Sequence, residues 1–282
     1  MKTQKRNISK PIIILGAPRS GTTILGQLLK HHQDLFYAEE YRLTWLYGNS
    51  GRSDLLRPRH ARPEVKKYIR KRFSAMVAGS GRARLLEKTP SNSLRPLFVE
   101  EVFPDALYLN ITRDPTECIL SMRDLWLRKA DGLRSVSRSN YLRRLKDLHP
   151  SQIPLMFKEV VKRALPSRNS DQPTNLWGPR VPGLATMVKD LELLEVCCIQ
   201  WRYCIDEVGF FKSVVPADRF LEIRLEDLCE ESLSEVMTFC GLGDDPKVWD
   251  NFKRKFKPNP SGHRKHQLKL EEYEVLRRWI ND

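Results

Sequence analysis

Short apolar runs alternate along the chain with longer stretches in which apolar residues recur at helical spacing. Four runs predict strands, the last of them alternating rather than continuous: 11–15, 84–86, 106–111 and 220–225. The longer stretches predict helices at 22–32, 64–76, 116–128, 191–208 and 232–240. Because strands alternate with helices, we expect an α/β fold: a parallel sheet of four or five strands with helices on both faces.

The stretch 132–182 breaks this alternation. It is rich in Arg, Ser, Pro and Asn, and its one amphipathic segment lies at 153–165. We therefore expect the whole chain, 1–282, to form a single domain in which 132–182 is an insertion, a lid over the acceptor site. The stretch also carries a group of basic side chains: Arg134, Arg138, Arg143, Arg144 and Lys146. These favour an anionic acceptor.

The composition indicates which classes of binding partner are favoured but does not identify one of them. The formal net charge of +14 favours anionic partners: a nucleotide, an acidic glycan, nucleic acid or a membrane surface. The six cysteines form no CxxC pair and show no metal-ligand spacing, so we expect reduced thiols and no metal site. The N-terminus is polar and is followed by too few apolar residues for a signal peptide or membrane span. This favours a cytoplasmic protein, or a chain from which an anchor has been removed.

Residues 16–23, GAPRSGTT, follow the first predicted strand and open the first predicted helix. Such a loop directs backbone N–H groups and the positive end of the helix toward an anion. A nucleotide-hydrolysing P-loop has Lys at the position of Thr22, whereas its hydroxyl position is kept here by Thr23. Arg19 supplies positive charge from within the loop instead. The loop therefore predicts a phosphate site that lacks the usual triphosphate-binding lysine, which counts against a kinase.

The segment PRSGTT after an apolar strand resembles the 5′-phosphosulfate loop of the sulfotransferases that use 3′-phosphoadenosine 5′-phosphosulfate (PAPS). The resemblance runs in order from residue 12 to about 270, except for 132–182, and its active-site segments are most similar to the tyrosylprotein and carbohydrate branch. It implies a P-loop-type sheet and a 5′-phosphate held by five loop residues: Arg19, Ser20, Gly21, Thr22 and Thr23.

A second phosphate site is implied by the turn at 112–115, TRDP, and the helix after it. An Arg at a strand end and a Ser eight residues later can converge on one anion. The pair Arg113 and Ser121 resembles the family's 3′-phosphate signature. Alternatively, Arg113 pairs with Asp114 or another acid and Ser121 faces solvent.

Two further segments supply candidates for the chemistry. The segment 87–90, EKTP, resembles the family's KTP segment, which implies that Lys88 lies near the oxygen bridging phosphorus and sulfur. The segment 36–42 resembles the GEETR-like segment of tyrosylprotein sulfotransferases, in which the second Glu is the base, here Glu40, with Glu39 as its alternative. Without the resemblance, Lys88 would be an exposed strand-end lysine, and the acids would be a loop pair that balances Arg42 or Arg57.

The basic segment 257–266 is broken by Pro and Gly and precedes an amphipathic helix that extends to Trp279. It resembles the family's loop over the 3′-phosphate and adenine, which implies that Arg264 and Lys265 bind the donor. A solvated basic linker is the other interpretation.

These features predict an enzyme, a PAPS-dependent sulfotransferase that releases 3′-phosphoadenosine 5′-phosphate (PAP). The sulfuryl group would pass in line to a hydroxyl of a glycan, a secondary metabolite or a peptide, with Glu40 as base and Lys88 and Arg19 neutralising the leaving phosphate, without a metal. The alternatives are a P-loop kinase of small molecules and a basic nucleic-acid-binding protein. The sequence contains no known nucleic-acid-binding motif, so we expect no specific nucleic-acid partner.

Overall fold

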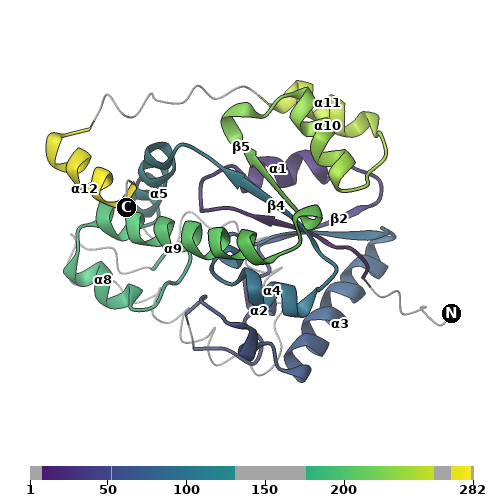
Figure 1. The fold of residues 1–282 in the computed structure, drawn as a ribbon, viewed down its shortest axis with the longest axis horizontal. Helices are drawn as coiled ribbons and strands as arrows, with labels where there is room; N and C mark the ends of the chain where they lie inside the picture. The colour runs from purple at the N-terminus through teal and green to yellow at the C-terminus, as the bar shows by residue number, and fades with distance from the viewer. Residues whose placement is uncertain (1–7, 52, 131–175, 257–267, 281–282) are drawn as a thin grey trace.

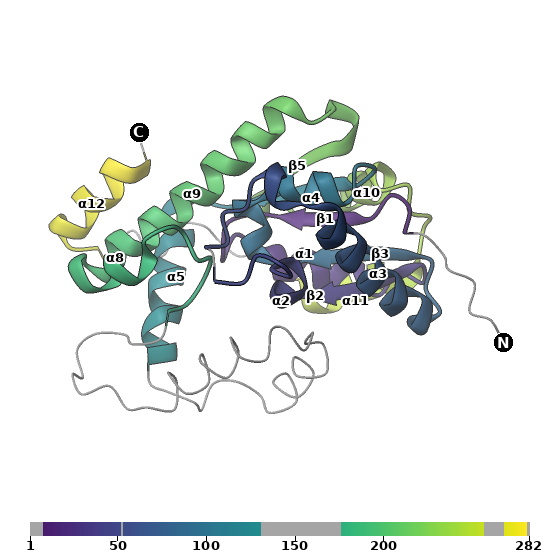
Figure 2. The same ribbon diagram turned by 90° about the horizontal axis from the view of Figure 1, so that it is seen from below.

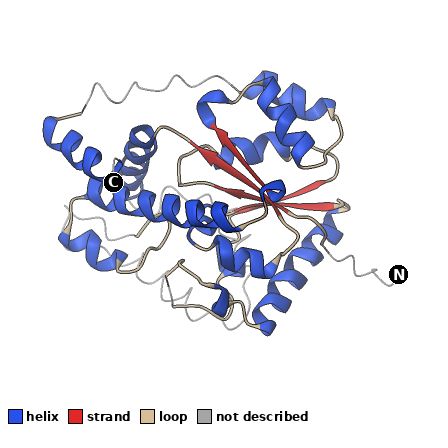
Figure 3. Ribbon diagram, in the orientation of Figure 1, coloured by secondary structure: helices blue, strands red, loops and turns tan. Residues whose placement is uncertain are grey.

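The computed structural model describes residues 8–51, 53–130, 176–256 and 268–280, and Figure 1 shows the rest as a thin trace. Five parallel strands form one sheet, in the order β2-β3-β1-β4-β5. Figure 3 shows them as a twisted fan among helices. The strands are β1 (Ile12–Leu15), β2 (Leu35–Glu39), β3 (Arg84–Lys88), β4 (Leu107–Thr112) and β5 (Phe220–Arg224). The predicted α/β class with a parallel sheet is confirmed.

The two faces of the sheet bury alternate residues of the same strand. In β1, Ile13 and Leu15 belong to one apolar cluster, while Ile12 and Ile14 belong to another, because successive side chains of a strand point to opposite faces. The first face is covered by α2 (Arg42–Trp45), α3 (Pro63–Ser80) and α4 (Pro96–Val102). The second is covered by α1 (Thr22–Leu29), α10 (Glu230–Phe239) and α11 (Pro246–Lys255). Both groups are visible in Figures 1 and 2.

A third apolar cluster lies beside the sheet and joins four helices. They are α5 (Pro115–Ala130), α8 (Leu184–Asp190), α9 (Leu193–Val214) and α12 (Leu270–Ile280). The far end of α9 reaches the sheet, where the ring of Phe211 packs edge-on against Tyr108, 4.6 Å between centroids. Short 3₁₀ turns connect the elements: η1 (Pro58–His60), η2 (Pro90–Leu94), η5 (Ala217–Arg219) and η6 (Leu225–Asp227).

The predicted strands and helices are all present, with ends shifted by a few residues. The sequence did not predict a strand at β2, and it missed the helices α2, α4, α8 and α11. The amphipathic segment 153–165, the five basic side chains of the expected lid, and Arg264 and Lys265 lie outside the described residues. Within the described part of the chain, no helix combines the length and apolar character needed to cross a membrane.

Candidate active site

The described residues that the sequence predicts for the reaction end or follow strands at the carboxyl edge of the sheet. Because all five strands are parallel, the loops after β1, β2, β3 and β4 emerge at this edge. Two of the strands also end level with each other, since Glu39 pairs with Lys88 in the β2–β3 register. β1 lies between β3 and β4 in the sheet. The loop that follows it, residues 16–23, is called the phosphate loop after the ligand that its sequence predicts. The strand order therefore brings the segments that carry the predicted site residues to one edge of the sheet.

The conformation of the phosphate loop depends on its glycines and on a serine from η2. The Ser93 hydroxyl accepts a hydrogen bond from Gly16 N–H and donates one to Gly16 C=O, both 2.9 Å long. A Cβ at Gly16 would lie 2.5 Å from the Ile111 carbonyl oxygen, and φ is +146° there. Gly21 precedes α1 with φ of +109°. Both conformations favour glycine.

The loop leaves polar groups available at the start of α1. The Ser20 hydroxyl is buried and has no hydrogen-bond partner among the described residues. Thr22 is also buried, whereas Thr23 is exposed. A buried hydroxyl without a partner carries a free-energy cost that an anion at the helix terminus would relieve. The loop therefore has a polar group at the helix terminus that could bind a phosphate; phosphate binding itself stays a prediction.

Arg19, Arg113 and Ser121 meet beside this loop. Arg19 Nε donates to Ser121 Oγ at 3.0 Å, and Arg113 Nη1 donates to the Arg19 carbonyl oxygen at 3.3 Å. Ser121 is 3% exposed, so it does not face solvent. Arg113 also pairs with Glu117 at 3.4 Å. The structure thus joins the two predicted phosphate sites through Arg19, a contact that neither motif showed alone.

Lys88 connects the phosphate loop to the carboxylates after β2. Its side chain is completely buried, so it is not an exposed strand-end lysine. Nζ lies 3.1 Å from Thr23 Oγ1, 3.0 Å from Glu39 Oε1 and 3.4 Å from Glu40 Oε1. One ammonium therefore touches both the loop and the two candidate bases.

Glu39 and Glu40 differ in their surroundings. The Glu39 side chain is 29% exposed and accepts a hydrogen bond from Gln27 Nε2 at 3.4 Å. The Glu40 side chain is 46% exposed, and its backbone has φ of +60°, uncommon for a residue with a side chain. Its N–H donates to the Lys88 carbonyl oxygen at 2.8 Å, which holds it against β3. Arg19 is the other candidate residue with a side chain and a positive φ, at +73°. Such strain clusters at functional sites, which favours Glu40 as the reacting carboxylate.

Comparison with known proteins decides the family. The model of the Sulfotransferase family matches residues 11–158, slightly more than half of the chain. This chain belongs to the Sulfotransferase family. Nodulation protein NoeE of Sinorhizobium fredii (strain NBRC 101917 / NGR234) is 27% identical over 129 residues. That match covers 40% of this chain and 31% of NoeE, so the chain spans less than a third of this relative's length.

Solved sulfotransferases share the fold. STF9 from Mycobacterium avium matches with a TM-score of 0.56 at 14% identity, covering 99% of this chain and 77% of the other. A sulfotransferase from Alicyclobacillus acidocaldarius matches with a TM-score of 0.52 at 16% identity, covering 97% and 92%. At these identities the similarity concerns the fold, and it agrees with the α/β architecture described above.

Glu87, to which the sequence gave no role, lies directly beside the candidate site of this sulfotransferase-family protein. It is completely buried beside Lys88 and accepts hydrogen bonds from Trp45 Nε1 at 2.9 Å, Thr89 Oγ1 at 2.5 Å and Asn92 Nδ2 at 2.9 Å. Burial raises its pKa to about 7, although the Thr89 and Trp45 hydrogen bonds act in the opposite direction. Its place in the EKTP segment was the only signal, and it gave no indication of burial.

This raised pKa predicts a stability that depends on pH. The folded pKa of Glu87, about 7, lies above its ordinary value of 4.5, so the folded state keeps a proton that the unfolded chain loses between these values. The contribution is complete below pH 4.5 and is lost as the pH rises through about 7, by about 3 kcal/mol in total. Urea unfolding at pH 5 and pH 8 should show this fall in the wild type, and a much smaller one in Glu87→Gln.

The control for this measurement is Glu101→Gln, which removes an acid that is 45% exposed and pairs with Lys66. It should keep the pH dependence of the wild type. Equal falls in the wild type and Glu87→Gln would show that the Glu87 carboxyl does not titrate in this range.

Proposed function

We propose that this protein transfers a sulfuryl group from PAPS to a hydroxyl acceptor. The observation that carries the proposal is the position of Lys88, buried between Thr23 of the phosphate loop and the Glu40 carboxylate. A cation at this place can neutralise a leaving phosphate while a carboxylate beside it accepts a proton. Family membership supports the same reaction.

Each group has a role that its position permits. The loop from Arg19 to Thr23 would hold the 5′-phosphate, and Arg113 with Ser121 the 3′-phosphate. PAPS supplies the sulfur electrophile and the phosphate leaving group. Glu40 would accept the hydroxyl proton as the acceptor oxygen forms its bond to sulfur. Lys88 and Arg19 would stabilise the negative charge that the phosphate oxygen gains as its bond to sulfur breaks.

The acceptor class, the anionic character of the acceptor and a cytoplasmic location stay predictions from the sequence. A glycan, a secondary metabolite or a peptide would each provide the hydroxyl that this chemistry needs. Among the described residues no group of three or more His, Cys, Asp or Glu side chains is arranged to hold a metal ion.

The donor site is tested by calorimetric titration with PAP, and with Mg-ATP beside it. We expect PAP to bind and Mg-ATP to bind far more weakly, because only PAP carries a 3′-phosphate. Arg113→Ala should weaken PAP about 10- to 100-fold, the value of a charge-assisted hydrogen bond. Arg113→Lys keeps a cation beside Glu117 and should therefore lose less PAP affinity than Arg113→Ala.

The matched control is Arg59→Ala, because Arg59 is an exposed arginine of η1. Its PAP affinity should equal that of the wild type. Preferred binding of Mg-ATP would favour the kinase alternative, and no binding of either nucleotide would reopen the nucleic-acid alternative.

A further inference from the structure

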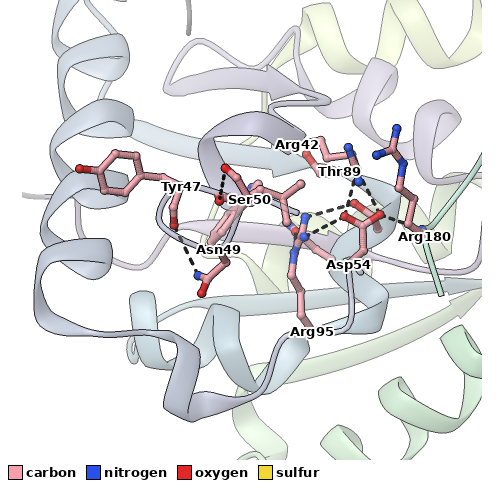
Figure 4. Close-up of polar contacts among 12 residues, drawn as sticks. Arg42, Tyr47, Asn49, Ser50, Asp54, Thr89, Arg95 and Arg180 are labelled. Carbon is pink, nitrogen blue, oxygen red and sulfur yellow. Dashed lines mark hydrogen bonds and ion pairs between the residues drawn. The ribbon is translucent and has the colours of Figure 1, made fainter. Parts of the chain in front are cut away.

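Asp54 is a buried carboxylate that ties three separate segments together near the carboxyl edge. It lies between α2 and η1, and its side chain is completely buried. Arg42 Nε donates to its two oxygens at 2.9 and 3.1 Å, and Arg95 Nη1 donates to Oδ1 at 3.2 Å. Arg180 N–H donates to Oδ2 at 2.8 Å, and the Arg180 carbonyl accepts from Asp54 N–H at 2.7 Å. Figure 4 shows these groups converging on Asp54.

The charges of Asp54 and of the two guanidinium groups beside it fix the relative positions of these segments. Burial by itself would raise the pKa of Asp54, but Arg42, Arg95 and the Arg180 N–H hold it below its ordinary value. The carboxylate is therefore ionised, with two guanidinium groups beside it. Arg95 is as fully buried as Asp54. A buried charge is tolerated only with its partners in place, so the relative positions of these segments are strongly fixed.

From Arg95 the hydrogen bonds continue to β3 and return to α2. Arg95 Nε donates to Asn92 Oδ1 at 2.8 Å, and Asn92 Nδ2 donates to Glu87 Oε2 at 2.9 Å. The other oxygen of Glu87 accepts from Trp45 Nε1 at 2.9 Å. Trp45 and Arg42 are the two ends of α2. The contacts therefore form a closed ring that fixes α2 against β3.

This ring holds the two reacting groups of the proposed mechanism. Glu40 lies two residues before Arg42, and Lys88 directly follows Glu87. Among the described residues, no side-chain hydrogen bond caps the start of α2, whereas Arg42 in its first turn is held by Asp54. We propose that Asp54 is a positioning residue, which through Arg42 and Arg95 sets the distance between the Glu40 carboxylate and Lys88 Nζ.

The inference depends on the proposed function. Its test uses water as the acceptor, so that the measured rate does not depend on the identity of the natural acceptor. PAPS then gives PAP and sulfate: a water oxygen bonds to sulfur, the bond from sulfur to the bridging phosphate oxygen breaks so that PAP leaves, and Glu40 accepts the proton of the water. The variants are Asp54→Asn and Arg42→Met, the second of which keeps the contacts of Asp54 with Arg95 and Arg180. The measurements are kcat and KM for PAPS, per site titrated with PAP.

We expect kcat to fall on the order of 10²-fold in both variants, the cost of a misplacement of about 1 Å, while KM for PAPS and the PAP affinity stay within about threefold. A merely structural role would lower the number of PAP-binding sites but leave kcat per site unchanged. Arg42→Lys should recover part of kcat. Combining Asp54→Asn with Arg42→Met should cost little more than either change, because both break the same ring.

The control is Asp206→Asn, which removes the acid of an exposed Arg202–Asp206 pair on α9 and should leave kcat unchanged. If the wild type converts PAPS and both variants do so at the same kcat per site, the positioning role of Asp54 is wrong and the proposed function stands. If the wild type neither binds PAP nor converts PAPS, the proposed function fails and the inference fails with it. If Asp54→Asn does not fold, Arg42→Met decides between these outcomes.

Discussion

Glu40→Gln is expected to lower kcat for sulfuryl transfer by about 10²- to 10⁴-fold, the usual contribution of a general base. Glutamine keeps the size of the side chain and loses its ability to accept a proton. The loop should survive, because the Glu40 backbone N–H still donates to the Lys88 carbonyl. PAP affinity should change little, since the phosphate sites do not include this carboxylate. The rate is measured as PAP release from PAPS with water as acceptor, beside a PAP titration.

Glu39→Gln is the matched variant, because Glu39 is the neighbouring carboxylate and also pairs with Lys88. We expect a loss of less than about tenfold, since the Glu39 side chain is the less exposed of the two and is held by Gln27. The opposite order of effects would assign the base to Glu39. Full activity in Glu40→Gln would exclude Glu40 as the base.

Lys88→Met should lower kcat by about 10²- to 10³-fold, the usual cost of removing one group that stabilises charge in the transition state. Methionine fills a similar volume in this completely buried position and removes the ammonium. The charge that develops on the leaving phosphate would then lose the buried cation beside Thr23 of the loop. Because the ground-state phosphate keeps Arg19 and the helix terminus, the effect should appear in kcat more than in KM for PAPS.

The matched variant is Lys212→Met, which removes a lysine that is 52% exposed and pairs with Glu222 of β5. Its kcat should equal that of the wild type. A Lys88→Met protein that binds PAP less well but keeps its kcat would place Lys88 in donor binding alone, outside the chemical step.

The donor-site motifs could be recognised because each of them is local. The loop 16–23 and the TRDP turn with Ser121 eight residues later each occupy one strand end and the helix that follows. The motifs do not predict which of their side chains contact each other in the folded protein. Arg19 contacts Ser121 across a separation of 102 residues, and Lys88 reaches Glu40 across 48. These contacts depend on the strand order β2-β3-β1-β4, which places distant chain segments side by side.

The contacts of Asp54 could not be predicted from the sequence. Its loop has no recognisable motif, and its partner Arg180 lies 126 residues away. Glu87 stood inside a motif, but its burial depends on the packing of Trp45 and η2 over β3. No pattern along the chain specifies which acidic residue loses its contact with water, because burial is decided by segments that come together only in the folded protein.

The sequence by itself thus determined the fold class, because periodicity is a property of neighbouring residues. Short motifs that resemble those of the family gave the candidate phosphate loop and the candidate lysine and glutamates. Tertiary structure alone decided that Lys88 is buried between the loop and Glu40, that Arg19 joins the two predicted phosphate sites, and that Asp54 ties α2 to β3. These features arise from parallel strands that bring the ends of distant segments to one edge, where buried charges persist only beside their partners.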